Sequence, residues 1–537
     1  MKKISAIYFS DNELHRLEVG YGIAALQSIN NQIYVKRIEC TNFDEALHFI
    51  KKESIELFVI FLSYDCYDLL TKTCREIKCA NKHSKIVICH SLVNSLYKNL
   101  LNEIPQIDIA VLGEYEVTLV ELADLILNGK EITSCRGIAF KEDGEIYVNS
   151  PRPLANIDKL PFPNRNFDYQ GSRFFHIYGS RGCEGFCTFC DRNCLYSNNC
   201  GRYVRWRSIE SIISEIDYLV ENYQCKFICF SDPTFVSSND AVDRLNELYD
   251  ALSKKNYWIQ FTFNIRAEQI NESVIKSLKK LKKYGLGNIF IGIESFNESD
   301  LKLYGKRADL HSIKKCVELL KAFTDFTDDY YVKVEYGFIN FNPYSTIAGL
   351  RNNIQSFKDL RLNLNPYIIA SKLTANSLTS ISAKIDLDRL FPFRLGLLPL
   401  CDALKYKFNY NFYNEDVQEI YSLVINVSRK VLVQNDNGTE FLRNRYIHYY
   451  GYDALIKKYD KAYGKWRNAV DEFSYNIFMF ILNYFNDNDI HRQIDLKAEK
   501  FLDNYFILEN KVKGIQQRVL IELKKIDQVI YYKPIFR

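Results

Sequence analysis

Three cysteines in a glycine-containing segment have the clearest potential for chemistry in this sequence. Cys183, Cys187 and Cys190 are separated by three and then two residues. This spacing lets three thiolates reach one face of an iron–sulfur cube, for which Cys thiolates are the usual ligands. A four-iron cube held by three cysteines has one iron without a protein ligand, and that iron can bind and activate a small molecule.

Two other interpretations of these cysteines remain open from the spacing alone. A structural zinc site requires four ligands, usually from pairs of C-x2-C, and Cys194 and Cys200 lie near enough to complete one. The three thiols could also be unrelated to one another. Iron and sulfide content after anaerobic reconstitution would separate the iron–sulfur interpretation from both.

Composition limits the classes of protein to which the chain can belong. With 537 residues, 47% of them hydrophobic, it is long enough for two or three domains with sizeable cores. A net charge of +4 with both signs interspersed does not indicate a dedicated nucleic-acid binder. The 15 cysteines show no regular pairing pattern, which predicts reduced thiols. We find no signal peptide and no apolar run of about 18 residues, so we expect a cytoplasmic protein without a membrane span.

Residues 1–150 alternate short apolar runs with helical patterns, which is typical of βαβ units and a parallel sheet. Five such units predict an α/β, doubly wound, Rossmann-like domain. Strands are expected at residues 4–9, 33–38, 57–62, 86–89 and 107–112, with helices between them, for example at 43–52, 67–80 and 116–127. Four prolines between residues 151 and 167 indicate an extended linker, placed at 151–169.

Residues 170–372 repeat the strand–helix rhythm six times, which predicts a partial (β/α)6 barrel. Strands are expected at residues 175–180, 226–231, 258–264, 288–293, 331–339 and 367–373. Functional residues of such barrels lie at the carboxyl ends of the strands. The cysteine segment, Asp232, Arg266 and Glu294 all follow an expected strand.

The remaining residues, 373–537, predict a mainly helical domain that caps the barrel or recognises the substrate. The best helical stretches are 416–432, 465–483 and 496–523, where apolar and charged residues interleave at helical spacing. The region contains one cysteine, Cys401, which excludes an additional cluster of the kind built from a cysteine-rich extension.

The cysteine spacing and the order of the elements after it resemble the radical S-adenosylmethionine (SAM) superfamily. The resemblance implies that the open iron of a [4Fe-4S] cluster chelates SAM and that Phe189 packs near the adenine. It also implies that Asp232 contacts the SAM ammonium and that Arg266 pairs with the SAM carboxylate. Glu294 and Ser295, in a G-x-E-S phrase, would lie near the ribose and the amino group.

Simpler roles for two of these residues have to be considered beside the family roles. Asp232 could cap the helix that follows it, which is a common role for Asp. Arg266 could form a salt bridge with Glu268. The sequence assigns no residue as catalytic.

The first 150 residues resemble the cobalamin-binding domain that precedes many radical SAM domains. The phrases at 19–26, 108–119, 135–139 and 160–163 carry this resemblance, and they imply cobalamin as a third cofactor. The D-x-H-x-x-G motif that supplies a cobalt ligand elsewhere is absent, and neither His48 nor His90 has its spacing. Cys89, His90 and Ser91 stand where the family usually has Gly-Gly, which lets backbone approach a cofactor closely. A domain that has kept the fold and lost the cofactor is the alternative.

The resemblance implies an enzyme that reductively cleaves SAM to a 5′-deoxyadenosyl radical. With cobalamin, its reaction would be methylation of an unactivated carbon in a peptide or specialised metabolite. The alternatives are cobalamin-independent rearrangement, epimerisation or dehydrogenation, and a tRNA-modifying enzyme. The expected partners are an electron donor such as flavodoxin or ferredoxin and a peptide or small-molecule substrate, and the balanced charge disfavours nucleic acid.

Overall fold

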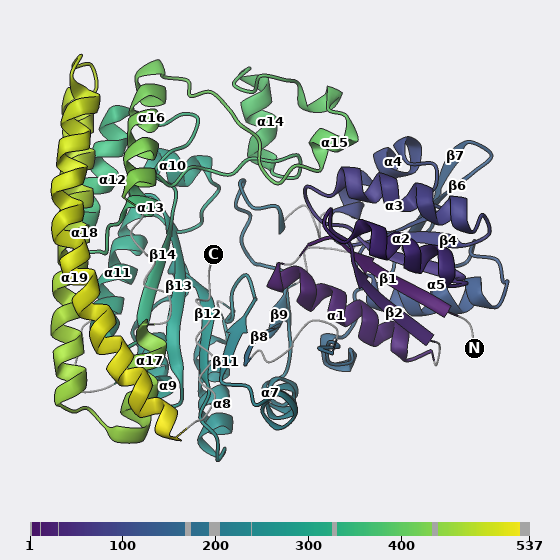
Figure 1. The fold of residues 1–537 in the computed structure, drawn as a ribbon, viewed down its shortest axis with the longest axis horizontal. Coiled ribbons are helices and arrows are strands. Elements are labelled where there is room, and N and C mark those ends of the chain that lie inside the picture. The colour runs from purple at the N-terminus through teal and green to yellow at the C-terminus, as the bar shows by residue number, and fades with distance from the viewer. Residues whose placement is uncertain are drawn as a thin grey trace. The chain divides into compact units, whose positions relative to one another are not determined.

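The chain forms two compact units in a computed structural model (Figure 1). The structure describes residues 3–10, 12–29, 32–166, 173–192, 204–237, 239–324, 330–431 and 439–526. The first unit comprises residues 1–171, 176–217 and 374–409, and the second comprises 172–175, 218–373 and 410–537. Each unit is therefore assembled from three separate stretches of the chain.

The first unit is built on a seven-stranded sheet with the order β2-β1-β3-β4-β5-β6-β7. Its strands are β1 (Lys3–Tyr8), β2 (Gln32–Arg37), β3 (Leu57–Phe61), β4 (Lys85–Cys89), β5 (Ile109–Val111), β6 (Ile138–Glu142) and β7 (Glu145–Val148). Strands β1 to β5 pair in parallel, as the alternating pattern predicted, whereas β6 and β7 add an antiparallel hairpin that we did not expect. The strand order reverses between β1 and β3, which is the switch point where ligands bind in such sheets.

Helices cover both faces of this sheet. They are α1 (Glu13–Gln27), α2 (Phe43–Lys52), α3 (Tyr67–Ala80), α4 (Val93–Glu103) and α5 (Glu116–Leu127), and α2, α3 and α5 have the predicted bounds. One apolar cluster contains residues of α2, α3 and α4, and a second contains residues of α1 and α5. Every residue of β3 is buried, as expected for a parallel strand with both faces covered.

Residues 374–409 complete the core of the first unit. Leu378, Leu400 and Leu404 belong to the same apolar cluster as Leu70 of α3. The short helix α15 (Leu400–Ala403) contacts α3 and α4, and the backbone N–H of Asp65 donates to the Leu404 carbonyl at 3.0 Å. This stretch also contains α14 (Ser380–Leu387). The chain thus returns to the first unit after the second sheet is finished.

The second unit carries a five-stranded sheet with the order β14-β13-β12-β11-β8. Its strands are β8 (Phe174–Ile177), β11 (Phe227–Phe230), β12 (Gln260–Arg266), β13 (Leu286–Glu294) and β14 (Lys333–Phe338). The pairs from β11 to β14 are parallel, as predicted. The helices between the strands are α7 (Ile209–Tyr223), α8 (Ala241–Ser253), α9 (Glu272–Lys282), α10 (Glu298–Leu303), α11 (Leu310–Thr324) and α12 (Ile347–Asp359). Residues 209–217 of α7 belong to the first unit.

The prediction of a sixth strand at residues 367–373 was wrong. Residues Pro366–Ile369 form the short helix α13, and Asn365 Oδ1 caps it by accepting from the Ile368 N–H at 3.0 Å. Proline at the first helical position favours this start because its fixed φ suits a helix. The strand is reduced to a single parallel bridge between Phe341 and Lys372.

Long helices dominate the last part of the second unit, as predicted. They are α16 (Glu415–Lys430), α17 (Thr439–Tyr450), α18 (Ala454–Tyr484) and α19 (Ile490–Ile526), and α18 and α19 lie side by side (Figure 1). A buried ion pair joins Arg443 of α17 to Asp460 of α18, with Nε and Oδ1 2.8 Å apart. Among the residues that the structure describes, no helix combines the length and apolar character needed to cross a membrane.

Candidate functional site

The three predicted cysteines lie on one short loop of the first unit. The loop follows β9 (Ser180–Arg181), which pairs with β10 (Arg205–Trp206), and Cys183, Cys187 and Cys190 are all partly exposed. The Gly185 N–H donates to Cys183 Sγ at 3.3 Å. Such N–H···S contacts stabilise a thiolate and tune a cluster bound to it. The loop therefore offers three accessible sulfur ligands.

Contacts from two directions fix this loop within the first unit. The Thr188 carbonyl accepts from the Ile381 N–H at 2.9 Å and from Ser380 Oγ at 3.1 Å. On the other side, the Tyr64 hydroxyl, which follows β3, donates to Asp191 Oδ2 at 3.0 Å. The returning stretch 374–409 and the parallel sheet thus both hold the cysteine loop.

Buried ion pairs anchor the strand that leads into the loop. Arg181 contacts Glu114 Oε1 at 3.3 Å and Glu116 Oε1 at 2.6 Å, and Arg205 of the paired strand also contacts Glu114. Burial alone would raise the pKa of Glu114, but the charges of Arg181 and Arg205 outweigh it and hold that pKa below its ordinary value. Two carboxylates of the phrase at 108–119 therefore position the start of the cysteine loop.

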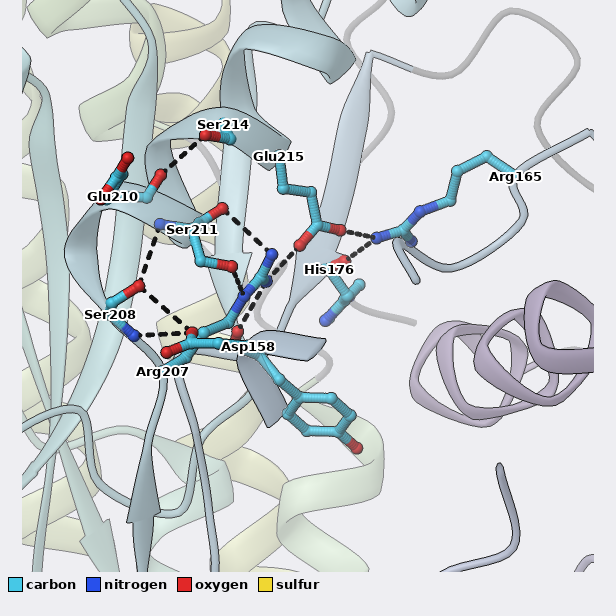
Figure 2. A network of polar contacts seen from close by, with 10 residues as sticks. Asp158, Arg165, His176, Arg207, Ser208, Glu210, Ser211, Ser214 and Glu215 are labelled. Atoms are coloured by element: carbon cyan, nitrogen blue, oxygen red, sulfur yellow. Dashed lines mark hydrogen bonds and ion pairs between the residues drawn. The ribbon is translucent and has the colours of Figure 1, made fainter. Parts of the chain in front are cut away.

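A second buried network holds the chain between β8 and β9 (Figure 2). Glu215 of α7 lies between two arginines, with Oε1 3.1 Å from Arg165 Nη2 and Oε2 in contact with Arg207. The same arginines donate to the backbone of the segment before the loop, Arg165 to the His176 carbonyl at 2.7 Å and Arg207 to the Tyr178 carbonyl at 3.2 Å. Sequence reasoning missed this network because its members are distant along the chain.

The other predicted site residues lie in the second unit at neighbouring strand ends. Asp232 follows β11, Arg266 is the last residue of β12, Glu294 is the last residue of β13, and Ser295 comes directly after it. Because these strands are adjacent and parallel, their carboxyl ends meet at one edge of the sheet. This is the edge at which functional residues of βα barrels lie.

Glu294 carries a largely buried carboxyl, 12% exposed, with a lysine beside it. Its backbone has a φ of 66°, and its Oε1 lies 3.5 Å from Lys306 Nζ, which also donates to the Gly292 carbonyl at 3.0 Å. A Cβ at Gly292 would lie 2.5 Å from Glu294 Oε1, so glycine is needed for the carboxyl to fold back here. Burial raises the pKa of Glu294, although Lys306 and Arg266 act in the opposite direction.

Arg266 forms the contact with Glu268 that we considered as its simpler role. Arg266 Nε donates to Glu268 Oε1 at 2.7 Å, and the pair is largely buried rather than on the surface. Asp232 is fully buried, and its carbonyl accepts from Asn264 Nδ2 at 2.6 Å. Phe189 lies on the cysteine loop of the first unit and is partly buried.

Ser295 faces a polar network around the start of α10. Its Oγ donates to Asp300 Oδ2 at 2.8 Å and lies 3.1 Å from Asn353 Oδ1. The amide of Asn342 donates to Asp300 Oδ1 and to the Tyr304 hydroxyl, both at 2.9 Å. The hydrogen bonds among these buried side chains stabilise the loops at this edge of the sheet.

A comparison with protein families covers both the cysteine loop and the strand-end residues. Residues 177–332 match the family model described as the radical SAM superfamily. Over this range the chain is similar to the radical SAM superfamily. The matched range contains the cysteine loop and the ends of β11, β12 and β13. A radical SAM domain implies a [4Fe-4S] cluster, as the cysteine spacing predicted, and SAM, as the resemblance implied.

Known relatives and solved structures extend the likeness beyond the radical SAM domain. An uncharacterized methyltransferase of Pyrococcus horikoshii is 28% identical over 303 residues, which cover 53% of this chain and 62% of that protein. The match thus spans less than two thirds of that relative. The cobalamin-dependent S-adenosylmethionine radical enzyme OxsB, with aqua-cobalamin bound, has a TM-score of 0.69 at 16% identity, covering 99% of this chain and 82% of that one.

A second solved structure has a similar fold. The radical S-adenosylmethionine methyltransferase TsrM from Kitasatospora setae, with cobalamin and a [4Fe-4S] cluster bound, has a TM-score of 0.58 at 13% identity, covering 77% of this chain and 84% of that one. At these identities the likeness concerns the fold. It confirms the predicted α/β architecture of a Rossmann-like domain, a radical SAM barrel and a helical C-terminal region.

The described residues fit the cofactors of a radical SAM protein. Three partly exposed thiols lie on one loop, and they would supply the three donors that a cluster with one open iron needs. Burial raises the pKa of Cys190 to about 11, so this thiol keeps its proton until a metal displaces it. In the second unit, Arg266 and Glu294 place a guanidinium and a carboxyl at one sheet edge, where they suit the charged amino-acid end of SAM.

Lys372 is a further residue of interest that sequence reasoning missed. It lies at the single bridge that replaces the sixth strand, with Nζ 4.0 Å from the ring centre of Tyr410, 4.9 Å from that of Tyr421 and 5.0 Å from that of Phe412. Aromatic faces attract a cation. Burial nevertheless lowers the pKa of Lys372 to about 8. The rings come from residues beyond 409, so no local sequence signal marks this contact.

Proposed function

We propose that this radical SAM protein is an enzyme that cleaves SAM reductively and uses the resulting radical on an unactivated carbon. Cys183, Cys187 and Cys190 would hold the cluster, and their placement on one anchored, partly exposed loop is the observation that carries the proposal. When bound and reduced, the cluster supplies one electron to the SAM sulfonium, which gives methionine and a 5′-deoxyadenosyl radical. The family requires a reductant, and a flavodoxin or ferredoxin would supply it here.

The strand-end residues would bind and orient SAM. Arg266 would pair with the SAM carboxylate through its planar fork, while Glu268 holds the guanidinium in place. Glu294 would accept from the ribose and the amino group, with Ser295 shaping the turn behind it, and Asp232 would accept from the ammonium. Burial of these groups strengthens each electrostatic contact because water is excluded.

Phe189 would pack against the adenine from the cysteine loop. An aromatic ring next to a ligating cysteine offers a flat apolar surface to a nucleobase. Its position, one residue before Cys190, is the support for this role.

We further propose that the first unit binds cobalamin and that the reaction is then methylation of a peptide or specialised metabolite. The support is the doubly wound sheet with its switch point between β1 and β3, in a chain whose fold matches OxsB along almost its whole length. Ligands of such sheets bind outside the carboxyl ends of the strands. The free cysteines among the described residues support a reducing cytoplasm as the location.

Anaerobic reconstitution tests both proposals. Protein loaded with iron, sulfide and hydroxocobalamin is passed through gel filtration, and its absorption spectrum and iron content are measured. We expect about four irons per chain and a retained cobalamin spectrum. Cys187→Ala should lose most of the iron, whereas Cys79→Ala, an exposed cysteine outside the loop, should not.

The outcomes separate the two proposals. Iron content that is equal in the Cys187 and Cys79 variants would refute the cluster assignment. A cluster without retained cobalamin would refute cobalamin binding, and the reaction would then be sought among rearrangement, epimerisation and dehydrogenation.

A further inference from the structure

Two histidines and a carboxylate, none of them on the cysteine loop, converge in the first unit. His15 and Glu18 are one helical turn apart on α1, and His90 directly follows β4. One ligand atom of each lies within 4.8 Å of the other two. His90 Nε2 is 2.7 Å from Glu18 Oε2, and the rings of His15 and His90 meet edge-on with centroids 5.1 Å apart.

His15 supplies the observation that points to a ligand. Its side chain is only 7% exposed, and its Nε2 has no hydrogen-bond partner in the described part of the chain. A buried polar nitrogen without a partner is costly, and native proteins rarely tolerate one.

His90 is held in a backbone conformation that side chains rarely adopt. Its φ is 124°, a value that favours glycine. Strain of this kind persists where surrounding structure enforces it, and it gathers at functional sites. The conformation places the His90 ring against Glu18, and Ser91 Oγ lies 3.3 Å from its Nδ1.

Two tyrosines outside the group formed by His15, Glu18 and His90 orient Glu18. The Tyr178 hydroxyl donates to Glu18 Oε1 at 3.1 Å, which leaves Oε2 facing His90. The Tyr115 hydroxyl donates to the Glu18 carbonyl at 2.8 Å and fixes this turn of α1. Carboxylates that bind metals are typically hydrogen-bonded from outside in this way.

We propose that His15, Glu18 and His90 bind a divalent transition-metal ion of the Zn²⁺ or Fe²⁺ class. Two imidazoles and one carboxylate form the ligand set of many zinc and non-haem iron sites. The ion would satisfy His15 Nε2 and replace the hydrogen bond between Glu18 and His90. His90 would then bind through Nε2, while its Nδ1 faces Ser91 Oγ at 3.3 Å and the Leu92 N–H at 3.4 Å. The three ligands of this site are distinct from Cys183, Cys187 and Cys190.

Cobalt(II) is the probe, because its visible absorption reports nitrogen and oxygen ligands directly. The parent for all variants is the full chain with Cys183, Cys187 and Cys190 replaced by alanine, which removes the cluster iron from the measurement. Bound metal is counted by mass spectrometry after gel filtration. We expect about one Co²⁺ per chain in this parent, and affinity at least tenfold lower after His15→Ala. His83→Ala, an exposed histidine of the same unit, should bind like the parent.

Two milder variants protect the test from misfolding. His90→Gly removes a ligand while relieving the positive φ, so it should fold at least as stably as the parent without metal and bind Co²⁺ at least tenfold more weakly. Tyr178→Phe removes only the hydroxyl that orients Glu18, and it should weaken Co²⁺ about tenfold.

Equal Co²⁺ affinity in the parent, His15→Ala and His90→Gly proteins would overturn the proposal. So would a parent that binds no Co²⁺. If His90→Gly changes the absorption of bound hydroxocobalamin while the parent binds no Co²⁺, the histidine serves cobalamin and the separate metal site is refuted.

Discussion

Glu215 offers the sharpest test of how the cysteine loop is positioned. Its carboxylate is 1% exposed and faces two guanidinium groups, those of Arg165 at 1% and Arg207 at 4% exposure. Glu215→Gln keeps the shape of the side chain but removes the negative charge that both buried arginines contact. We expect the first unit to lose stability and the segment between β8 and β9 to loosen.

The magnitude follows from the burial of all three partners. Removing one member of a buried ion pair costs about 3–5 kcal/mol, because the remaining charge is left uncompensated. Glu215 also keeps the pKa of Arg207 above its ordinary value against the opposing effect of burial, which shows how strongly the pair is coupled. For a unit of 150–250 residues, about 2–4 °C of melting temperature corresponds to 1 kcal/mol. The expected decrease is therefore at least about 6 °C.

The assay has to measure the unfolding of the first unit separately, because the two compact units need not unfold together. Of the three tryptophans, Trp206 lies in the first unit, so its fluorescence is followed with Trp258 and Trp466 replaced by phenylalanine. Glu210→Gln is the matched control, because Glu210 is exposed on the same helix α7 (Figure 2). It should change the free energy of unfolding by no more than about 0.5 kcal/mol.

The reasoning fails if Glu215→Gln melts within about 2 °C of the Glu210→Gln control. Such a result would mean that water or a rearranged partner compensates both arginines. A large loss of stability with unchanged iron content after reconstitution would keep the energetic argument and refute the positioning of the cysteine loop by this network.

Further predictions concern the second unit. Gly285→Ala should lower the unfolding free energy of this unit by at least about 1–3 kcal/mol, because φ is 110° and a Cβ would lie 1.8 Å from a backbone carbonyl oxygen. Gly464→Ala has open space around it in α18 and should instead raise the unfolding free energy by about 0.4–1 kcal/mol. Urea unfolding measures both changes. The pKa of Lys372 falls from 10.5 to about 8 on folding, so the unfolded chain binds more protons than the folded chain between these two pH values. The free energy of unfolding should therefore rise with pH across this window. Lys372→Met should abolish that rise. Gly292→Ala should displace the Glu294 carboxyl. The loss of one charged hydrogen bond should weaken SAM binding at least about tenfold, as measured by calorimetry. Unchanged SAM affinity would contradict the proposed role of Glu294.

Elements and local phrases were predictable because their signals are local. The helices at 43–52, 67–80 and 116–127 alternate buried and exposed residues at helical spacing, and each has the predicted bounds. The G-x-E-S phrase correctly placed Glu294 at a strand end. The expected strand at 367–373 failed where two local signals conflicted, because the cap at Asn365 and the proline after it outweighed the apolar run that follows.

The contacts that complete the sites were not predictable, because they join residues far apart in the chain. Glu215 and Arg165 are 50 residues apart, Glu18 and His90 are 72 apart, and the order of the sequence does not reveal either contact. Ser295 likewise looks like a free hydroxyl in its phrase, yet its partner Asn353 is 58 residues away. Pairings of this kind follow from the packing of the whole unit.

The return of residues 374–409 to the first unit has a consequence for biosynthesis. A chain emerging from the ribosome can form the first parallel sheet early, but Leu378, Leu400 and Leu404 arrive only after the second sheet has been synthesised. Until then, part of the first apolar core stays open to water, which is when nascent chains aggregate or recruit chaperones. A fragment cut between the two sheets would keep that opening permanently, so the Rossmann-like unit cannot be isolated by simple truncation and is best studied in the full chain.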